Sequence, residues 1–405
     1  MKSTIVMALV AAALLALSPT APALAHGVEA GADLRVTQTF GAGEVTLVIA
    51  GVSQAPAPLL VNAQAVHPIS LKLELRSLTD GSTSTGSVSV GREPAVLQAG
   101  HAGPYELRVR AGDEVSVIPF RVLVPGSAWW TMVGDGAVLA LGLLLVGGVL
   151  ANRMPRPLVG AASAAAAVAV VVMLLKPYLP PVQQPGATPV AEPGRPYAQG
   201  RFSTQPARPA TGAEFTLTLR LADGSTGRPV DDLAVHHEAP AHLVITSQDG
   251  AVFRHLHPLR TAPGVLTVRL SLPRPGRYLA HSEIERQQSG GQLLSGAFEV
   301  SGTARPVSQE TAVPRLTPAA PVAGSPVTIE IGTQGPIRPW LGMPGHLIVR
   351  SQDGAHLAHA HGTADSASAL RFTLTLPEPG RYLAWAQYLE GGGLLTRSFT
   401  LEVDR

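Results

Sequence analysis

Short stretches of alternating apolar and polar residues make up most of the first third of the chain. Clear examples are residues 44–50, 70–76 and 105–110. This two-residue period is typical of strands with one buried face, and turn residues separate the stretches at short intervals. The pattern predicts an extracytoplasmic β-sandwich over residues 26–125.

Two long apolar stretches interrupt this pattern, at residues 128–151 and 157–176. Each is long enough to cross a bilayer, which needs about 20 residues. Arg153 and Arg156 lie between them, and positive residues beside a span favour the cytoplasmic side. We therefore predict a two-span transmembrane hairpin in the cell membrane, with the regions on both sides of it in the extracytoplasmic or periplasmic space.

Two further segments of the chain have recognisable compositions, one at the N-terminus and one directly after the second predicted span. Residues 1–25 have a positive Lys2, an apolar stretch and a small-residue cleavage site, which is the pattern of a signal peptide. The mature chain is then expected to begin at His26. Residues 177–200 are rich in proline, which predicts a stiff, extended linker.

Two related β domains are predicted after the linker, over residues 201–301 and 312–405. Both contain the sequence Leu-Pro-x-Pro-Gly-Arg-Tyr-Leu-Ala, at 272–280 and 376–384. The expected fold class is therefore all-β, with three Ig-like or cupredoxin-like sandwiches and the transmembrane hairpin between the first and the second.

A histidine pattern occurs once in each of these two domains. The first copy contains His242, His255 and His257, and the residue numbers of the second are each larger by 104 (346 minus 242): His346, His359 and His361. Both copies also contain Ser-Gln-Asp-Gly-Ala between the first and second histidine. Asp-Gly between two strand-forming stretches predicts a two-residue type I′ hairpin turn.

Such a turn would place His242 opposite His257 and His346 opposite His361. His255 and His359 would lie on the same face of their hairpins. Opposed Cβ atoms are about 4.5–5.5 Å apart, so three imidazoles could converge on one metal ion. The alternative is structural: the rings pack against the facing sheet or bond to backbone carbonyls.

Other candidate ligands are His281, as a fourth ligand in the first copy, and His26, whose α-amine and imidazole could chelate Cu(II). The chain has no cysteine, which excludes disulfides, thiolate sites and a blue-copper centre. Imidazole suits copper, zinc and nickel, and divalent affinity peaks at copper. The net charge of +2 gives no reason to expect a nucleic-acid partner.

The proline-glycine-aromatic start of the final hairpins, the export signal and the histidine-bearing hairpins resemble a group of bacterial secreted sandwiches. These are the FixH/YtkA-like and copper-resistance (cupredoxin-like) domains. The resemblance implies a role in metal handling outside the cytoplasm.

These observations predict a membrane-anchored, extracytoplasmic protein that binds a transition metal, with copper first and zinc or nickel as alternatives. Its role would be sequestration, sensing or delivery. Its partners would be the lipid bilayer and a membrane metal transporter or oxidase-assembly protein. We find no motif of nucleophilic or phosphate chemistry and expect no enzyme. The alternative is an Ig-like interaction or assembly module of a membrane complex with purely structural histidines.

Overall fold

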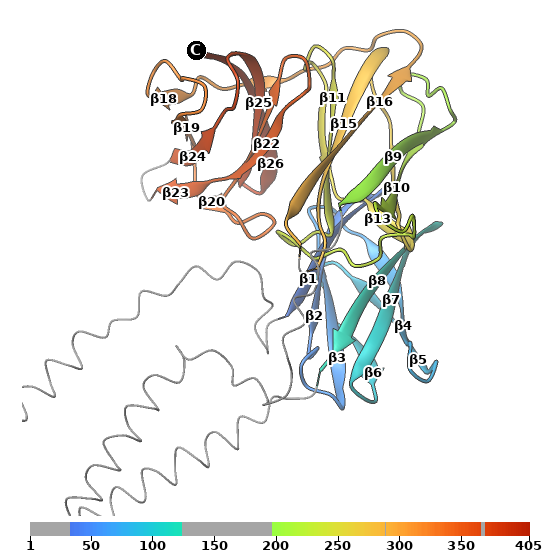
Figure 1. Cartoon of the computed structure of the whole chain (residues 1–405). Coiled ribbons are helices and arrows are strands. Elements are labelled where there is room, and N and C mark those ends of the chain that lie inside the picture. Colours follow the sequence, from blue (N-terminus) through green and yellow to red (C-terminus); the bar gives the residue numbers. More distant parts are fainter. Residues whose placement is uncertain (1–32, 124–196, 288, 366–368) are drawn as a thin grey trace, which may run out of the picture.

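The computed structural model describes residues 33–123, 197–287, 289–365 and 369–405. These ranges contain 26 strands and no helix, so an all-β fold of tandem sandwiches is confirmed (Figure 1). No helix suited to crossing a membrane occurs within these ranges. The predicted signal peptide, both predicted spans and most of the predicted linker lie outside them. The end of that linker is already strand, since β9 begins at Ala198.

The first sandwich consists of two four-stranded sheets, and every strand pair in it is antiparallel. Alternating residues such as Leu47 and Ile49 from one sheet and Leu71 and Leu73 from the other form its core. The strands, in the order of each sheet, are β1 (Leu34–Phe40), β2 (Gly43–Ala50), β3 (Ala57–Gln64) and β6 (Ala95–Ala99), then β5 (Thr83–Ser89), β4 (Ser70–Ser77), β7 (Gly103–Ala111) and β8 (Glu114–Val122).

The second sandwich, called repeat 1 (198–300), also has two four-stranded sheets. The sheet that carries the first histidine hairpin has β11 at its centre. The strands, in the order of each sheet, are β13 (Leu259–Ala262), β14 (Val265–Leu270), β10 (Phe215–Asp223) and β9 (Ala198–Gln205), then β12 (Phe253–Leu256), β11 (Ala241–Ser247), β15 (Gly276–Glu285) and β16 (Gly291–Val300).

The third sandwich, called repeat 2 (310–403), has a six-stranded and a four-stranded sheet. Its β21 corresponds to β11 of repeat 1. The strands are β17 (Glu310–Thr311), β26 (Gly393–Val403), β25 (Gly380–Glu390), β21 (His346–Ser351) and β22 (Leu357–His361), with β20 (Ile337–Arg338) beside β25, then β18 (Arg315–Thr317), β19 (Pro326–Gly332), β24 (Ala369–Thr375) and β23 (Thr363–Asp365).

The two repeats pack against each other through the sheets that carry β11 and β21. Every residue of both strands is buried. One face of β11 belongs to its own core, while Val244 on the other face packs against Ile348 of β21. Phe253 of repeat 1 stacks on Trp385 of repeat 2 with ring centroids 4.9 Å apart. The outer faces of the histidine hairpins are therefore inside the contact between the repeats.

This contact has approximate two-fold symmetry. A Cβ on Gly250 would come within 2.6 Å of Leu383, and a Cβ on Gly354 would come within 2.3 Å of Leu279, the residue equivalent to Leu383. Reciprocal contacts of this kind are the mark of a two-fold arrangement. Each hairpin loop is thus seated on the opposite repeat, with its glycine directly against a leucine side chain.

Arg350 fixes the two repeats to each other. Its guanidinium is fully buried and donates to Thr246 Oγ1, Ser247 O and Gln248 O of repeat 1 at 2.5–3.1 Å. A buried guanidinium needs such partners, because each unmet donor costs free energy.

The first sandwich docks onto repeat 1 beside the histidines. In Figure 1 it lies below repeat 1. Thr39 N of β1 donates to His257 O, and His257 N donates to Thr39 Oγ1, at 2.7 and 2.9 Å. Leu259 of repeat 1 belongs to the core of the first sandwich. His257 is therefore held between two sandwiches.

Candidate metal centre

The first histidine hairpin pairs β11 and β12 in the predicted register. Leu243 lies opposite Leu256, and Val244 lies opposite His255. One step further along the same register, His242 faces His257, and their ring centroids are 5.0 Å apart. Repeat 2 has the equivalent pairs: His346 lies opposite His361, and Ile348 lies opposite His359. The predicted strand register is confirmed in both hairpins.

The predicted type I′ turn is wrong. Ser247 N donates to Val252 O and Gly250 N donates to Ser247 O, so four residues connect the strands. Gly250 has a φ of +74°, but Asp249 is not among the positive-φ residues. Asp249 Oδ1 instead accepts from Ser247 Oγ and Ala251 N within the loop. A four-residue loop has the same parity as a two-residue loop, so the histidines keep their faces.

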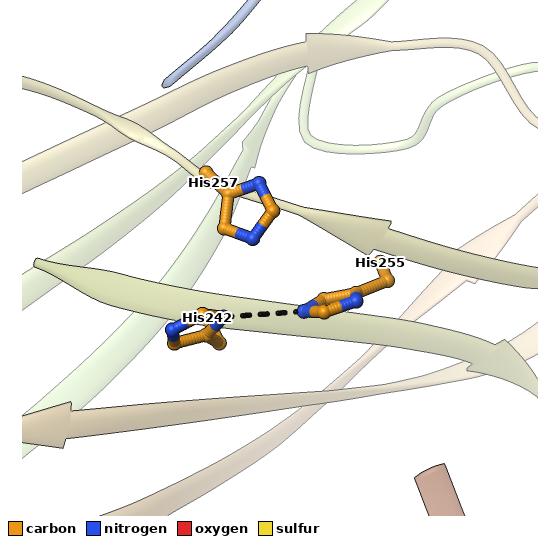
Figure 2. A group of neighbouring side chains, drawn as sticks. All are labelled: His242, His255 and His257. Carbon is orange, nitrogen blue, oxygen red and sulfur yellow. Dashed lines mark hydrogen bonds between the residues drawn. The ribbon is translucent and has the colours of Figure 1, made fainter. Parts of the chain in front are cut away.

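Each hairpin brings its three histidines together (Figure 2 for repeat 1). One ring nitrogen from each of His242, His255 and His257 lies within 4.8 Å of the others, and the same holds in repeat 2. Side chains of the first triad are 0–7% exposed. In repeat 2, His346 is fully buried, the side chain of His359 is 3% exposed, and His361 is partly buried. The triad of repeat 1 is thus His242, His255 and His257, and the triad of repeat 2 is His346, His359 and His361.

The hydrogen bonds of the first triad determine where its protons are. His242 Nε2 donates to His236 O, and His255 Nδ1 donates to Gln387 Oε1, both at 2.9 Å. A neutral imidazole has one N–H and one lone pair. His242 Nδ1 and His255 Nε2 face each other at 3.3 Å, the contact drawn dashed in Figure 2, and when both rings are neutral in these tautomers neither atom carries a proton.

Repeat 2 has the same arrangement with different partners. His346 Nε2 donates to Trp340 O at 3.1 Å, and His359 Nδ1 donates to Glu283 Oε2 at 2.9 Å. His346 Nδ1 and His359 Nε2 then face each other at 2.9 Å. Between two neutral rings, lone pairs at this distance repel, and either a metal ion or a proton between them removes the repulsion.

The third histidine of each triad also presents a free nitrogen. His257 Nδ1 donates to Glu44 Oε2 of the first sandwich at 2.7 Å, while its Nε2 is buried without a partner. His361 Nε2 is likewise buried without a partner. Since buried polar atoms are nearly always satisfied, these two atoms need an explanation.

A metal ion explains both the facing lone pairs and the orphaned nitrogens. Two nitrogens bound to zinc at about 2.0–2.1 Å with tetrahedral angles lie roughly 3.3 Å apart. The observed separations of 3.3 and 2.9 Å are close to that value. Metal-bound histidines also usually donate their other N–H to a carboxylate, a carbonyl or water. Five of the six histidines have such a protein acceptor, counting the Gln387 amide.

Burial favours the neutral form of four of the six imidazoles. Burial, reinforced by the neighbouring histidines, holds the pKa of His242, His255 and His346 well below 6.5. Burial and His359 lower the pKa of His361 to about 3. Because a metal binds only unprotonated imidazole, these rings are ready to act as ligands at neutral pH.

One carboxylate supports each triad. Burial opposes the ionisation of Glu44, but its electrostatic interaction with His257 and the hydrogen bonds from His257 and Trp340 outweigh burial, so the pKa of Glu44 is lowered. Burial also opposes the ionisation of Glu283, and His359 outweighs it in the same way, so this pKa is lowered as well. Each triad therefore has a negative charge next to it, which favours a cation.

The remaining sequence-predicted candidates lie elsewhere. His281 is buried on β15, where its Nε2 donates to Gly354 O, and it lies outside the three-histidine group. His26 lies outside the described residues. His356 follows the loop, where its ring lies 3.5 Å from Glu378. His237, which precedes β11, has its ring centroid 3.7 Å from that of His361.

Three residues that orient the histidines were missed in the sequence. Glu44, Glu283 and Gln387 come from different sandwiches, and no local pattern marks them. Glu283 and Gln387 are 104 residues apart (387 minus 283), like the histidines themselves. Comparing all equivalent polar positions of the repeats could have found this pair.

The comparisons with known proteins add little about function. A family model described as a domain of unknown function (DUF8832) matches residues 199–302 and 315–405. A search of the curated proteins finds no match.

Solved structures give only distant matches. A structure of a bacterial ice-binding adhesin is 9% identical, with 86% of this chain and 90% of that chain covered, at a TM-score of 0.19. A tetra-tandem repeat from the extending region of a large adhesion protein is 8% identical, with 92% and 74% covered, at 0.19. Red sea bream transglutaminase is 10% identical, with 51% and 31% covered, at 0.18. At these scores the matches carry no argument, and the informative similarity is that of residues 199–302 and 315–405 to one domain family of unknown function.

Proposed function

We propose that this protein binds two transition-metal ions through its two histidine triads. The observation that carries this proposal is the pair of facing ring nitrogens in each triad, 3.3 Å apart in repeat 1 and 2.9 Å apart in repeat 2. In each triad these two nitrogens face each other and converge with a third nitrogen, from His257 or His361, that is buried without a partner.

Copper is the ion that this donor set favours first. All three donors are imidazole nitrogens, and no thiolate is available because the chain lacks cysteine. Imidazole binds copper, zinc and nickel, and copper has the highest affinity in the divalent series. Three protein ligands also leave one position open on the ion.

The cellular role follows from the predicted export signal and membrane hairpin. In this proposal the sandwiches lie outside the cytoplasm, anchored to the bilayer. There they hold copper for sequestration, sensing or delivery. A metal transporter or an oxidase-assembly protein in the same membrane would be the partner. The competing proposal, an assembly module with structural histidines, requires no metal.

Metal analysis of the purified full chain separates the two proposals. After loading with Cu(II) and removal of excess ions, we expect two equivalents per chain. His257→Ala and His361→Ala should each lose one equivalent, and together nearly all. His356→Ala is the matched control, since this histidine lies outside both triads. Wild-type protein that holds no copper after loading would contradict the proposal.

A further inference from the structure

The two triads lie against each other at the contact between the repeats. The ring centroids of His255 and His359 are 5.2 Å apart, those of His242 and His359 are also 5.2 Å apart, and those of His255 and His346 are 5.9 Å apart. Within the triads, neighbouring centroids are 4.8–5.5 Å apart. Because the two spacings overlap, the six rings form one continuous cluster.

Each triad also depends on the opposite repeat. Gln387 of repeat 2 accepts the hydrogen bond that orients His255 of repeat 1. In the reciprocal contact, Glu283 of repeat 1 orients His359 of repeat 2. Each triad therefore has its three histidines in one repeat and one orienting partner in the other, so the docking of the repeats completes both sites together.

Building on the proposed metal binding, we propose that the two copper ions form one dinuclear centre and share a small bridging ligand. Each ion takes three nitrogens and keeps an open position. Two-metal centres in proteins hold their ions about 3.5–4 Å apart, so that one small ligand reaches both. His255 and His359, in the middle of the cluster, bind different ions while their rings remain neighbours. The class of bridging ligand is hydroxide or another small anion.

Two cavities adjoin this cluster. A cavity of about 160 Å³ is lined in part by His236, His242 and Glu283. A second cavity of about 790 Å³ is lined in part by Glu44, His255 and Trp340. A water molecule takes up about 30 Å³ in the liquid, so even the smaller cavity accommodates a small anion with water.

Electron paramagnetic resonance of the copper-loaded full chain tests this proposal. Two Cu(II) ions that share a ligand couple their spins, so the integrated signal at two equivalents should be less than half of that from two isolated ions. Titration with azide, a small anion that bridges copper pairs, should saturate at one azide per two coppers. His361→Ala should bind one copper with the full signal of one spin.

The outcomes are distinguishable from failure of metal binding itself. Two bound coppers with the full additive signal would overturn the dinuclear centre and leave the metal-binding proposal standing. A single bound copper per chain would also overturn it, in favour of one shared ion. One azide per copper would overturn the shared ligand. Absence of bound copper would instead refute the proposed function on which this inference rests.

Discussion

Glu44 of the first sandwich accepts a hydrogen bond from His257 Nδ1 of repeat 1 at 2.7 Å. Its other oxygen accepts from Trp340 Nε1 of repeat 2, also at 2.7 Å. One carboxylate thus contacts all three sandwiches and orients a candidate ligand 213 residues away along the chain. The first sandwich is therefore part of the candidate centre, even though it lacks a triad.

Replacement of Glu44 by glutamine should weaken metal binding at the triad of repeat 1. The amide removes the negative charge that supports His257, and losses of this kind typically cost about 10–100-fold in affinity. The measurement is a competitive copper titration in the His361→Ala background, where only the repeat 1 site remains.

Glu106→Gln is the matched control for that experiment. Glu106 also belongs to the first sandwich and faces repeat 1, where it lies 3.8 Å from Arg260. Equal losses of affinity in the two variants would mean that docking of the first sandwich, and not the carboxylate at His257, accounts for the effect.

Glu283→Gln should weaken the site of the opposite repeat. Glu283 lies in repeat 1 but orients His359 of repeat 2. In the His257→Ala background, which leaves the repeat 2 site alone, we expect copper affinity to fall by about 10–100-fold. In the His361→Ala background the same substitution should have little effect. The opposite pattern would show that each site draws on its own repeat.

The histidine hairpins were predictable from the sequence because their geometry is local. The Asp353-Gly354 pair predicts the position of the turn between His346 and His361. With an even number of loop residues the histidines share one face of the hairpin, and with an odd number they do not. The observed loop has four residues, so the histidines share a face as predicted, although the turn type was not predicted. Its Asp249 and Asp353 act through side-chain hydrogen bonds, and neither has a positive φ.

The convergence of the two triads was not predictable in this way. The sequence suggested two separate sites, one on each hairpin. Their contact depends on how repeat 1 docks onto repeat 2, which Arg350, Trp385 and the seats of Gly250 and Gly354 determine. Such contacts leave no periodic pattern along the chain.

The metal-free protein should lose stability as the pH falls below about 7. His242, His255 and His346 have folded-state pKa values well below 6.5, chiefly because of burial, and that of His361 is about 3. In the unfolded chain these groups titrate near 6.5. Below that pH the unfolded chain binds more protons than the folded chain, so the free energy of unfolding decreases.

Urea unfolding of the metal-free protein between pH 7.5 and 4.5 measures this effect. The free energy of unfolding should fall steadily across this range, and the fall should be smaller in His242→Gln. His356→Ala should behave like the wild type. A free energy that stays constant from pH 7.5 to 4.5 would show that the buried histidines are not held neutral.

Arg350→Ala should loosen the contact between the repeats. The loss of three hydrogen bonds from a buried guanidinium is expected to destabilise the protein by about 2–3 kcal/mol. Copper affinity should fall with it, since Gln387 and Glu283 orient the ligands from across this contact. Arg381→Ala, at an exposed ion pair with Glu402, should change stability by less than about 1 kcal/mol. Thermal melting of both variants tests this prediction. Equal decreases in melting temperature for the two variants would contradict it.

The most direct test of the metal centre is an anomalous diffraction map of copper-loaded crystals, collected at the copper edge. Two peaks are expected between the repeats. One should lie among His242 Nδ1, His255 Nε2 and His257 Nε2, and the other among His346 Nδ1, His359 Nε2 and His361 Nε2. Peaks confined to other histidines such as His67 or His101, with none between the repeats, would contradict the assignment of the triads as metal sites.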